Sequence, residues 1–250
     1  MLLMPLMIPL LTSLISVVVR GRLQTVINLF SSGLLLLSAV LLLMQVSTNG
    51  DQSIALGNWP LPYAIEFAVD GLSALMVLLI ALVSSAVLLY QADWNETAEK
   101  TGTYPLLHGL VAASIAVSMS ADLFNLYVWF ELMLITVLGL FILGGGKQHH
   151  EAALKYFTIS MLGTLLMLAA VGLIYATTGH LNFNALQLAS QTPALSGSLL
   201  LYTGLLFIAL LLKIGAFPLF AWLPASYHTL PAPLLALVGG LLTKVSLYVM

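Results

Sequence analysis

The chain contains no cysteine and very little charge, and both shortages narrow its possible functions. Without cysteine it has no disulfide, thiolate metal site, iron–sulfur ligand or reactive thiol. Charged residues make up 6% and hydrophobic residues 61% of its 250 residues, whereas about a quarter of the residues of a soluble protein are charged. Since so few polar side chains cannot cover a globular surface, we expect an all-α integral membrane protein surrounded by the lipid bilayer.

Patterns that bind nucleic acid, cofactors or metals are also missing. The net charge is −2, and no basic run is present to bind nucleic acid. There is no glycine-rich phosphate loop, nucleophile elbow or haem-ligand pattern, so we expect no cofactor and no catalytic chemistry in this chain. His149 and His150 beside Glu151 follow a glycine run and are expected to be solvated, so no metal site is predicted.

Long apolar runs predict about eight membrane-spanning helices, because a crossing helix needs about 20 mostly apolar residues. The polar breaks between the runs are too short for a soluble domain, so we expect a single membrane domain over residues 1–250. The break at 144–151 is expected to be flexible, and 177–197 to be a short polar stretch. The expected spans are residues 2–19, 23–46, 71–91, 105–120, 122–143, 152–176, 198–220 and 231–250.

The basic residues outside these spans predict the orientation. With eight spans, all of them fall in loops on one side of the membrane, which the positive-inside rule makes cytoplasmic. The N-terminus and the loop 47–70 are then outside, with Trp59 and Tyr63 at the depth of the interface. The basic residues concerned are Arg20, Arg22, Lys100, Lys147 and Lys155.

Three charged residues lie deep inside apolar segments: Glu131, Lys213 and Lys244. A charge near the bilayer centre costs about 2.5–3.5 kcal/mol even on lenient insertion scales, so such residues face a bundle interior or a watery cavity. One carboxylate and two ammonium groups at similar depth indicate a charge relay. Ion or proton translocation is therefore the leading interpretation of the sequence.

The residues around each of these three charges allow a second interpretation of its role. Glu131 lies about 14 Å into the fifth span, where it is either a proton-binding group or part of a structural ion pair. Lys213 comes shortly before Gly215 and Pro218, which predict a broken helix with freed carbonyls; alternatively it snorkels to the cytoplasmic surface. Lys244 lies near mid-depth of the eighth span, where the alternative is a lysine paired only for packing.

Two further polar residues lie near the starts of expected helices. His108, near the beginning of the fourth span, is expected at the membrane interface, with a role in proton entry as the alternative. Asp122 stands at the turn between the fourth and fifth spans. It is expected to cap the fifth helix rather than to bind an ion.

The segments from Asp122 to Met133, from Lys213 to Pro233 and from Leu241 to Val245 resemble, in this order, the antiporter-like membrane subunits. These occur in multisubunit cation/proton antiporters, respiratory complex I and membrane-bound hydrogenases. The stretch from Trp222 to His228 and the loop from Asn58 to Ile65 are most similar to the D subunits of Mrp-type sodium/proton antiporters. The resemblance covers essentially the whole chain.

The resemblance implies roles for individual residues. Glu131 matches the family's fifth-helix glutamate, and Lys213 the lysine of the broken seventh helix, which together form a switchable ion pair. Lys244 matches the eighth-helix lysine that passes the proton onward. His228 would lie beside the cytoplasmic entry, and Asp70 would cap the third span at the outer surface.

Family members have about fourteen helices with two inverted repeats, and this chain has only the first. Residues 1–103 would be the N-terminal helices and 104–250 a truncated first repeat, so the chain is expected to be a fragment or half of a split subunit. The implied function is proton translocation in a Na⁺/H⁺ antiporter of the prokaryotic inner membrane, with other membrane subunits as partners. The alternative is a proton-pumping subunit of a quinone-reducing or hydrogen-evolving redox complex.

Overall fold

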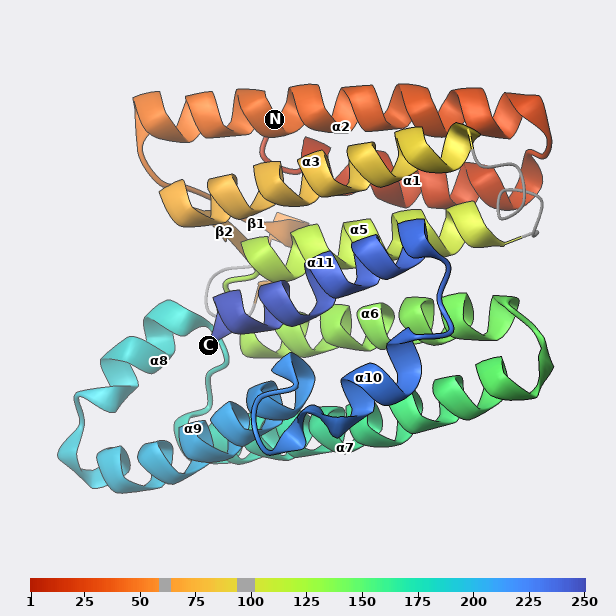
Figure 1. Ribbon diagram of the computed structural model, residues 1–250. Coiled ribbons are helices and arrows are strands. Elements are labelled where there is room, and N and C mark those ends of the chain that lie inside the picture. The colour runs from red at the N-terminus through yellow and green to blue at the C-terminus, as the bar shows by residue number, and fades with distance from the viewer. Residues whose placement is uncertain (59–63, 94–101) are drawn as a thin grey trace.

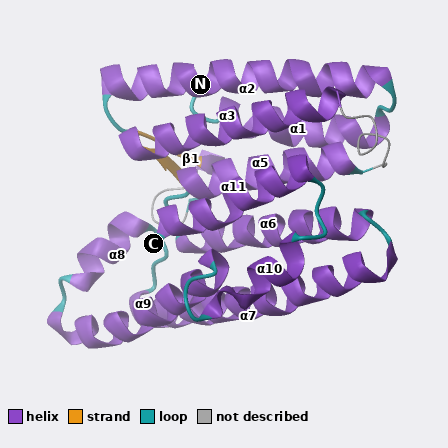
Figure 2. Ribbon diagram, viewed as in Figure 1, coloured by secondary structure: helices purple, strands orange, loops and turns teal. Residues whose placement is uncertain are grey.

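The computed structural model describes residues 1–58, 64–93 and 102–250 and is helical over most of this length (Figures 1 and 2). A two-stranded antiparallel hairpin, β1 (Gln52–Ala55) and β2 (Glu66–Val69), and two short 3₁₀ helices, η1 (Leu56–Asn58) and η2 (Leu219–Ala221), complete the fold. The helices are α1 (Met4–Val18), α2 (Arg22–Asn49), α3 (Gly71–Asp93), α5 (Thr103–Met119), α6 (Leu123–Leu143), α7 (Gly146–Thr178), α8 (Phe183–Ser190), α9 (Pro193–Ile214), α10 (Trp222–Tyr227) and α11 (Ala232–Val249).

Six helical segments in the described part of the chain are long and apolar enough to cross a membrane, and α1 and α5 are shorter apolar helices. These segments coincide with the eight spans expected from the sequence, and α9 is interrupted as predicted. The expected fold class, an all-helical membrane domain with a broken seventh span, is therefore confirmed. The chain is a multi-pass membrane protein.

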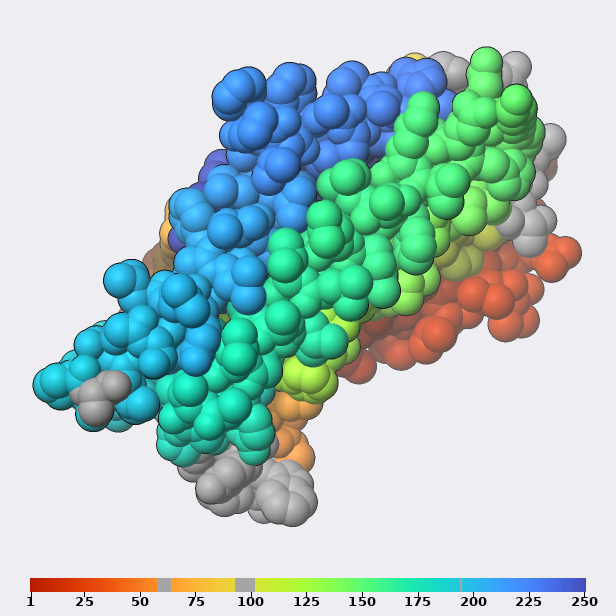
Figure 3. All heavy atoms as spheres, turned by 90° about the horizontal axis from the view of Figure 1, so that it is seen from below, coloured from red at the N-terminus to blue at the C-terminus, as the bar shows by residue number. Residues whose placement is uncertain are grey.

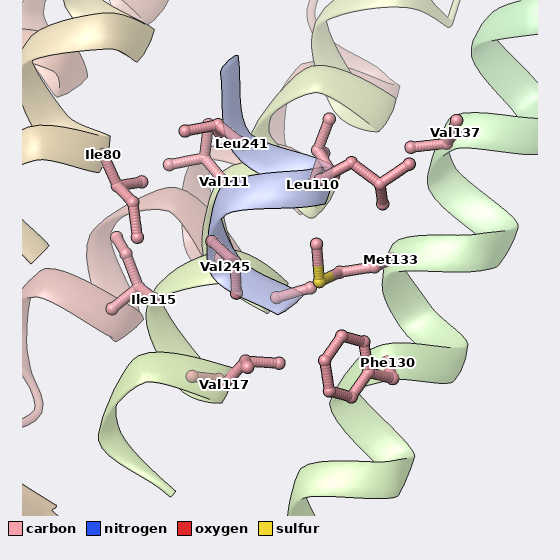
Figure 4. Close-up of a cluster of buried hydrophobic side chains, with 14 of the residues drawn as sticks. Ile80, Leu110, Val111, Ile115, Val117, Phe130, Met133, Val137, Leu241 and Val245 are labelled. Carbon is pink, nitrogen blue, oxygen red and sulfur yellow. The ribbon is translucent and has the colours of Figure 1, made fainter. Parts of the chain in front are cut away.

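Helix α5 is the centre of the bundle and packs against α1, α3, α6 and α11. Figure 1 shows α5 and α11 between the α1–α3 group and α6. In the close-up, Ile80 of α3 and Ile115 of α5 point toward each other, and Leu241 and Val245 of α11 lie beside them (Figure 4). All four side chains have 0% exposure. Such burial of aliphatic side chains fixes the relative positions of these three helices.

The connections from α1 to α2, at Arg20, and from α6 to α7, beside Lys147, lie at one end of the bundle. This end is called the basic end. The hairpin and α8 lie at the opposite end of the molecule (Figure 1). Lys100, Trp59 and Tyr63 fall outside the described residues. Figure 3 shows α7 running along one face of the molecule, with the segment from α9 to α10 beside it.

Three local expectations are wrong. The break expected at 144–151 is short, because α7 already begins at Gly146 and contains His149 and His150. The stretch 177–197 includes the helix α8, whose first turn is capped by the side chain of Asn182. The loop 47–70 includes a β-hairpin, in which Ser53 pairs with Ala68. Turn residues and short helices leave weak sequence signals, and that is why these elements were not predicted.

Candidate ion-translocation site

The position of Glu131 is set by the start of α6. The backbone N–H of Asn125 donates to the Asp122 carboxylate at 2.8 Å, so Asp122 is the N-cap, as the sequence predicts. An N-cap fixes where the helix begins and therefore which residues share a face. Glu131 follows about two and a half turns later, partly buried, and the hydroxyl of Tyr127, one turn before it, lies beside its carboxylate.

Lys213 lies in the last turn of α9 and is 8% exposed. Its Nζ stands 4.9 Å from the ring centroid of Phe130, the neighbour of Glu131 on α6. A cation at this distance over an aromatic face is attracted by the ring quadrupole, more strongly where water is excluded. A Cβ added at Gly163 of α7 would lie 3.6 Å from Cγ of Lys213, so α7 passes close to the stem of the lysine.

Glu131 of α6 and Lys213 of α9 do not form a direct salt bridge. The carboxylate charge acts on the ammonium group, yet the one ion pair that the described residues form at contact distance is Lys147–Glu151, which lies on the surface. A separated pair of opposite charges in a low-dielectric setting attracts over several ångströms. Each charge also has another neighbour, the Phe130 ring for Lys213 and the Tyr127 hydroxyl for Glu131.

A small cavity adjoins Lys213, with a volume of about 10 Å³, close to the smallest space that holds one water molecule. Polar residues in its lining are Ser160 on α7, Ser246 on α11 and Lys213. Phe130, Tyr156 and Trp222 supply aromatic walls. A single bridging water here would place Lys213 in contact with hydroxyl groups on two other helices.

The helix break beside Lys213 is built from Gly215 and Trp222. Helix α9 ends at Ile214, where Gly215 adopts φ 70°, and regular structure resumes at Leu219 beyond Pro218. The indole Nε1–H of Trp222 donates to the carbonyl of Leu212 at 3.2 Å, and the backbone N–H of Gly215 donates to the same carbonyl at 3.2 Å. A Cβ on Gly215 would lie 2.5 Å from Cδ1 of Leu223, so a larger residue has no room at this position.

Lys244 is not brought to this cavity. The buried face of α11 carries Leu241, Val245 and Ser246, whereas Lys244 is exposed on the surface of this chain. Its Nζ donates to the carbonyl of Gly239 at 2.9 Å. The sequence led us to expect a lysine enclosed by a bundle interior, and the structure places it on an uncovered face of α11.

The remaining predicted residues lie apart from Lys213. His228 is exposed at the end of α10, with Nδ1 3.1 Å from the carbonyl of Pro224. Asp70 accepts from the backbone N–H of Ser73 at 2.7 Å, which caps α3 and holds the pKa of this carboxyl below its ordinary value. His108 is 1% exposed and enclosed by protein, and its depth at the membrane interface stays a prediction.

Sequence reasoning missed two groups of residues. The aromatic walls of the Lys213 cavity were not predicted, because Tyr156 and Trp222 come from α7 and α10 and meet only in the folded bundle, with ring centroids 5.7 Å apart. Glu66 is 3% exposed and accepts a hydrogen bond from Asn182 Nδ2 at 2.6 Å. An acidic residue between apolar neighbours, Ile65 and Phe67, is the sequence signal that would have indicated a buried carboxylate.

Comparison with known proteins is consistent with this geometry. Residues 120–250, which contain α6 to α11, match the family described as "NADH:quinone oxidoreductase/Mrp antiporter, TM". The matched segment contains Glu131, Lys213 and Lys244. The chain belongs to this family of membrane subunits, and the resemblance inferred from its motifs is confirmed.

Individual known proteins show the same similarity as the family match. The chain is 35% identical over 249 residues to the D subunit of the Na(+)/H(+) antiporter of Bacillus subtilis, a match that covers 98% of this chain and 50% of that relative. In the structure of the Mrp complex from Dietzia sp. DQ12-45-1b, one chain superposes with a TM-score of 0.90 at 28% identity, covering 99% of this chain and 47% of the other.

A respiratory complex contains a similar fold. One chain of the archaeal membrane-bound sulfane sulfur reductase superposes with a TM-score of 0.90 at 25% identity, covering 99% of this chain and 51% of the other. The chain therefore spans about half the length of the relatives it matches. The likeness extends over nearly all of its own residues, from the N-terminal helices to α11.

Proposed function

We propose that this chain is the proton-translocating part of a membrane subunit in a multisubunit Na⁺/H⁺ antiporter. The observation that carries the proposal is the burial of the Lys213 ammonium at a helix break, beside Phe130 and within the field of Glu131. A buried charge is costly to maintain and is found in membrane helices mainly where ions or protons move. The similarity to the D subunit of a Na(+)/H(+) antiporter supports Na⁺ as the coupling ion.

In the proposed mechanism, Lys213 alternates between two arrangements. When its ammonium approaches Glu131, the attraction between the charges stabilises the protonated lysine. When the two separate, burial favours the neutral amine, and the proton leaves toward the hydroxyl-lined cavity. The break after Ile214 provides the hinge, since Gly215 leaves the helical conformation with φ 70° and regular structure resumes only at Leu219.

Lys244 would receive the proton and pass it out of this half. An exposed lysine in a membrane helix is costly when it faces lipid, so we propose that further protein of the same complex covers the Lys244 face of α11. We also propose that residues 1–103 and 104–250 are the N-terminal helices and the first antiporter-like repeat. Residues such as His228, exposed at the basic end, would adjoin the cytoplasmic entry.

Orientation and location follow from the same proposal. Arg20, Arg22 and Lys147 share the basic end, which supports a cytoplasmic position for that end and an N-terminus outside. The protein would then lie in the inner membrane of a prokaryotic cell. Asp70 and the hairpin would face the exterior.

The test is made on inverted vesicles from cells that produce the complete complex. Addition of Na⁺ should collapse an imposed pH gradient, and deletion of this chain should abolish that response while a control with K⁺ reports the ion preference. The second candidate is a proton-pumping subunit of a redox complex, favoured by the likeness to the sulfane sulfur reductase. Copurification of flavin or iron–sulfur proteins, with no response to Na⁺ or K⁺, would favour this second candidate over the first.

A further inference from the structure

Three buried polar side chains on α3 and α5 have no hydrogen-bond partner within the described residues. Gln91 is 0%, Tyr104 2% and His108 1% exposed. Both amide atoms of Gln91, the Tyr104 hydroxyl and both ring nitrogens of His108 are buried without a partner in this part of the chain. Buried polar atoms in native proteins are nearly always satisfied, by protein groups or by ordered water. Several unsatisfied atoms in one region therefore need an explanation.

The three side chains share one interface, as the packing of the core shows. Ile80 of α3 and Ile115 of α5 point toward each other (Figure 4). Gln91 follows Ile80 by eleven residues and Tyr104 precedes Ile115 by eleven. Eleven residues are about three helical turns, or about 16 Å. In this antiparallel pair, Gln91 and Tyr104 therefore lie at the same level and on the faces that meet.

His108 belongs to the same group. It stands four residues after Tyr104, so the two side chains lie on one face of α5. It precedes Ile115 by seven residues, about two turns, which keeps it on the face toward α3. Unlike Glu131 and Lys213, it lies toward the basic end of the bundle, and it does not line the cavity beside Lys213.

Polar side chains of the neighbouring helices α1 and α2 lie at this end of the bundle. Ser13 of α1 donates to the carbonyl of Pro105 at 2.8 Å, next to Tyr104 in sequence. Ser16 of α1 donates to Asn28 of α2 at 3.1 Å, also buried. The Tyr104 hydroxyl lies toward Thr25 of α2 without reaching hydrogen-bond geometry. Polar groups on three sides give a water molecule the two to four partners that it needs.

We propose that Gln91, Tyr104 and His108 bind a cluster of ordered water in the α3–α5 interface, at a site separate from Lys213. The amide supplies a donor and an acceptor, the hydroxyl supplies both, and the imidazole supplies one of each when neutral. This water keeps a titratable imidazole in contact with a proton carrier inside the membrane domain. The proposal does not depend on which ion the complex transports.

X-ray radiolytic labelling tests the proposal in native membranes. Hydroxyl radicals form from bound water and oxidise the side chains beside it, and mass spectrometry locates the oxygen added. Tyr104 and His108 should be modified several-fold faster than Phe141, an equally buried aromatic side chain of α6 at 0% exposure. Labelling of both residues at the rate of Phe141 would show a dry interface and overturn the proposal.

Two apolar variants provide an independent test, because the expected change in melting temperature has opposite signs for a wet and a dry site. In a wet site, Gln91→Leu and His108→Leu remove water ligands, so each should lower the melting temperature and slow the labelling of Tyr104. In a dry site the same substitutions remove unsatisfied polar atoms and should raise the melting temperature. If either variant fails to fold, the labelling of the unaltered protein still decides between a wet and a dry interface.

Discussion

The hydrogen bond from Trp222 to the Leu212 carbonyl should stabilise the helix break on which the Lys213 site depends. Trp222→Phe keeps an aromatic ring in place but removes the indole N–H, which donates at 3.2 Å. Trp222 is 4% exposed, so its hydrogen bond lies in a mostly water-free setting, and its loss leaves the Leu212 carbonyl with the backbone N–H of Gly215, at 3.2 Å, as its remaining donor. Losing one intramolecular hydrogen bond costs about 0.5–1.5 kcal/mol. For a chain of this size we expect a melting temperature lower by several degrees.

Trp129→Phe is the matched control. Trp129 lies on α6 in the same region of the bundle, and its buried Nε1 has no hydrogen-bond partner within the described residues. This substitution removes the same atoms but breaks no hydrogen bond. Both variants are compared in the assembled protein by scanning fluorimetry and by Na⁺-dependent proton flux. The reasoning predicts a larger loss of both for Trp222→Phe, and it is refuted if the two variants lose equal stability and equal flux.

Four further predictions concern other parts of the chain. Gly215→Ala should lower stability by about 1–3 kcal/mol, because φ is 70° and the new Cβ would meet Leu223. Gly204→Ala on α9 is the control and should be neutral or stabilising, because the space around Gly204 is open. Equal effects of the two substitutions on thermal melting would contradict this prediction. Asp70→Ala should cost about 0.5–2 kcal/mol at pH 7 through loss of the α3 cap. Folding lowers the pKa of Asp70, so the stabilisation is fully present above about pH 3.8, the ordinary pKa of the carboxyl. It is lost as the pH falls through the lower pKa of the folded state. If the difference in melting temperature between Asp70→Ala and the unaltered protein stays constant down to pH 2, the result would count against the cap. Lys244→Arg should reduce proton flux as Lys244→Ala does, because a guanidinium does not release its proton; full flux with arginine would make Lys244 a fixed charge. A cysteine at Asn49 should react with an impermeant thiol reagent in intact cells and one at Gly145 should not, and the reverse pattern would exclude the proposed orientation.

Much of the fold follows from the sequence because apolar length and helix caps are local properties. The eight helical spans, the break after Lys213 and the cap at Asp122 each depend on a few neighbouring residues. The sequence does not predict the hairpin of β1 and β2, because its strand β2 is stabilised by packing against one end of the bundle. The isolated bridge between Phe67 and Ser120 is one such contact. The sequence does not predict helix α8 either, which is short, has no buried residue and begins at the Asn182 cap.

The sequence predicts which charged residues belong to the site but not how they are arranged. Charge burial alone identified Glu131 and Lys213, since a charge in an apolar span needs a compensating environment. The sequence does not show which helix faces meet, so the contact of Lys213 with Phe130 and the outward position of Lys244 became visible only in the structure. The burial of His108 has the same origin, because α5 is central in the bundle while its sequence is no more apolar than that of its neighbours.

The central claim is that Glu131 and Lys213 carry protons together, and it is tested most directly by Na⁺-driven proton flux in inverted vesicles that contain the complete complex. Lys155→Ala is the matched control, since Lys155 is an exposed lysine of α7. The account predicts that Glu131→Ala and Lys213→Ala each abolish or strongly reduce the flux, that the complex still assembles, and that Lys155→Ala transports normally. Near-normal flux in both Glu131→Ala and Lys213→Ala, with assembly intact, would contradict it and would leave the pair a structural role only.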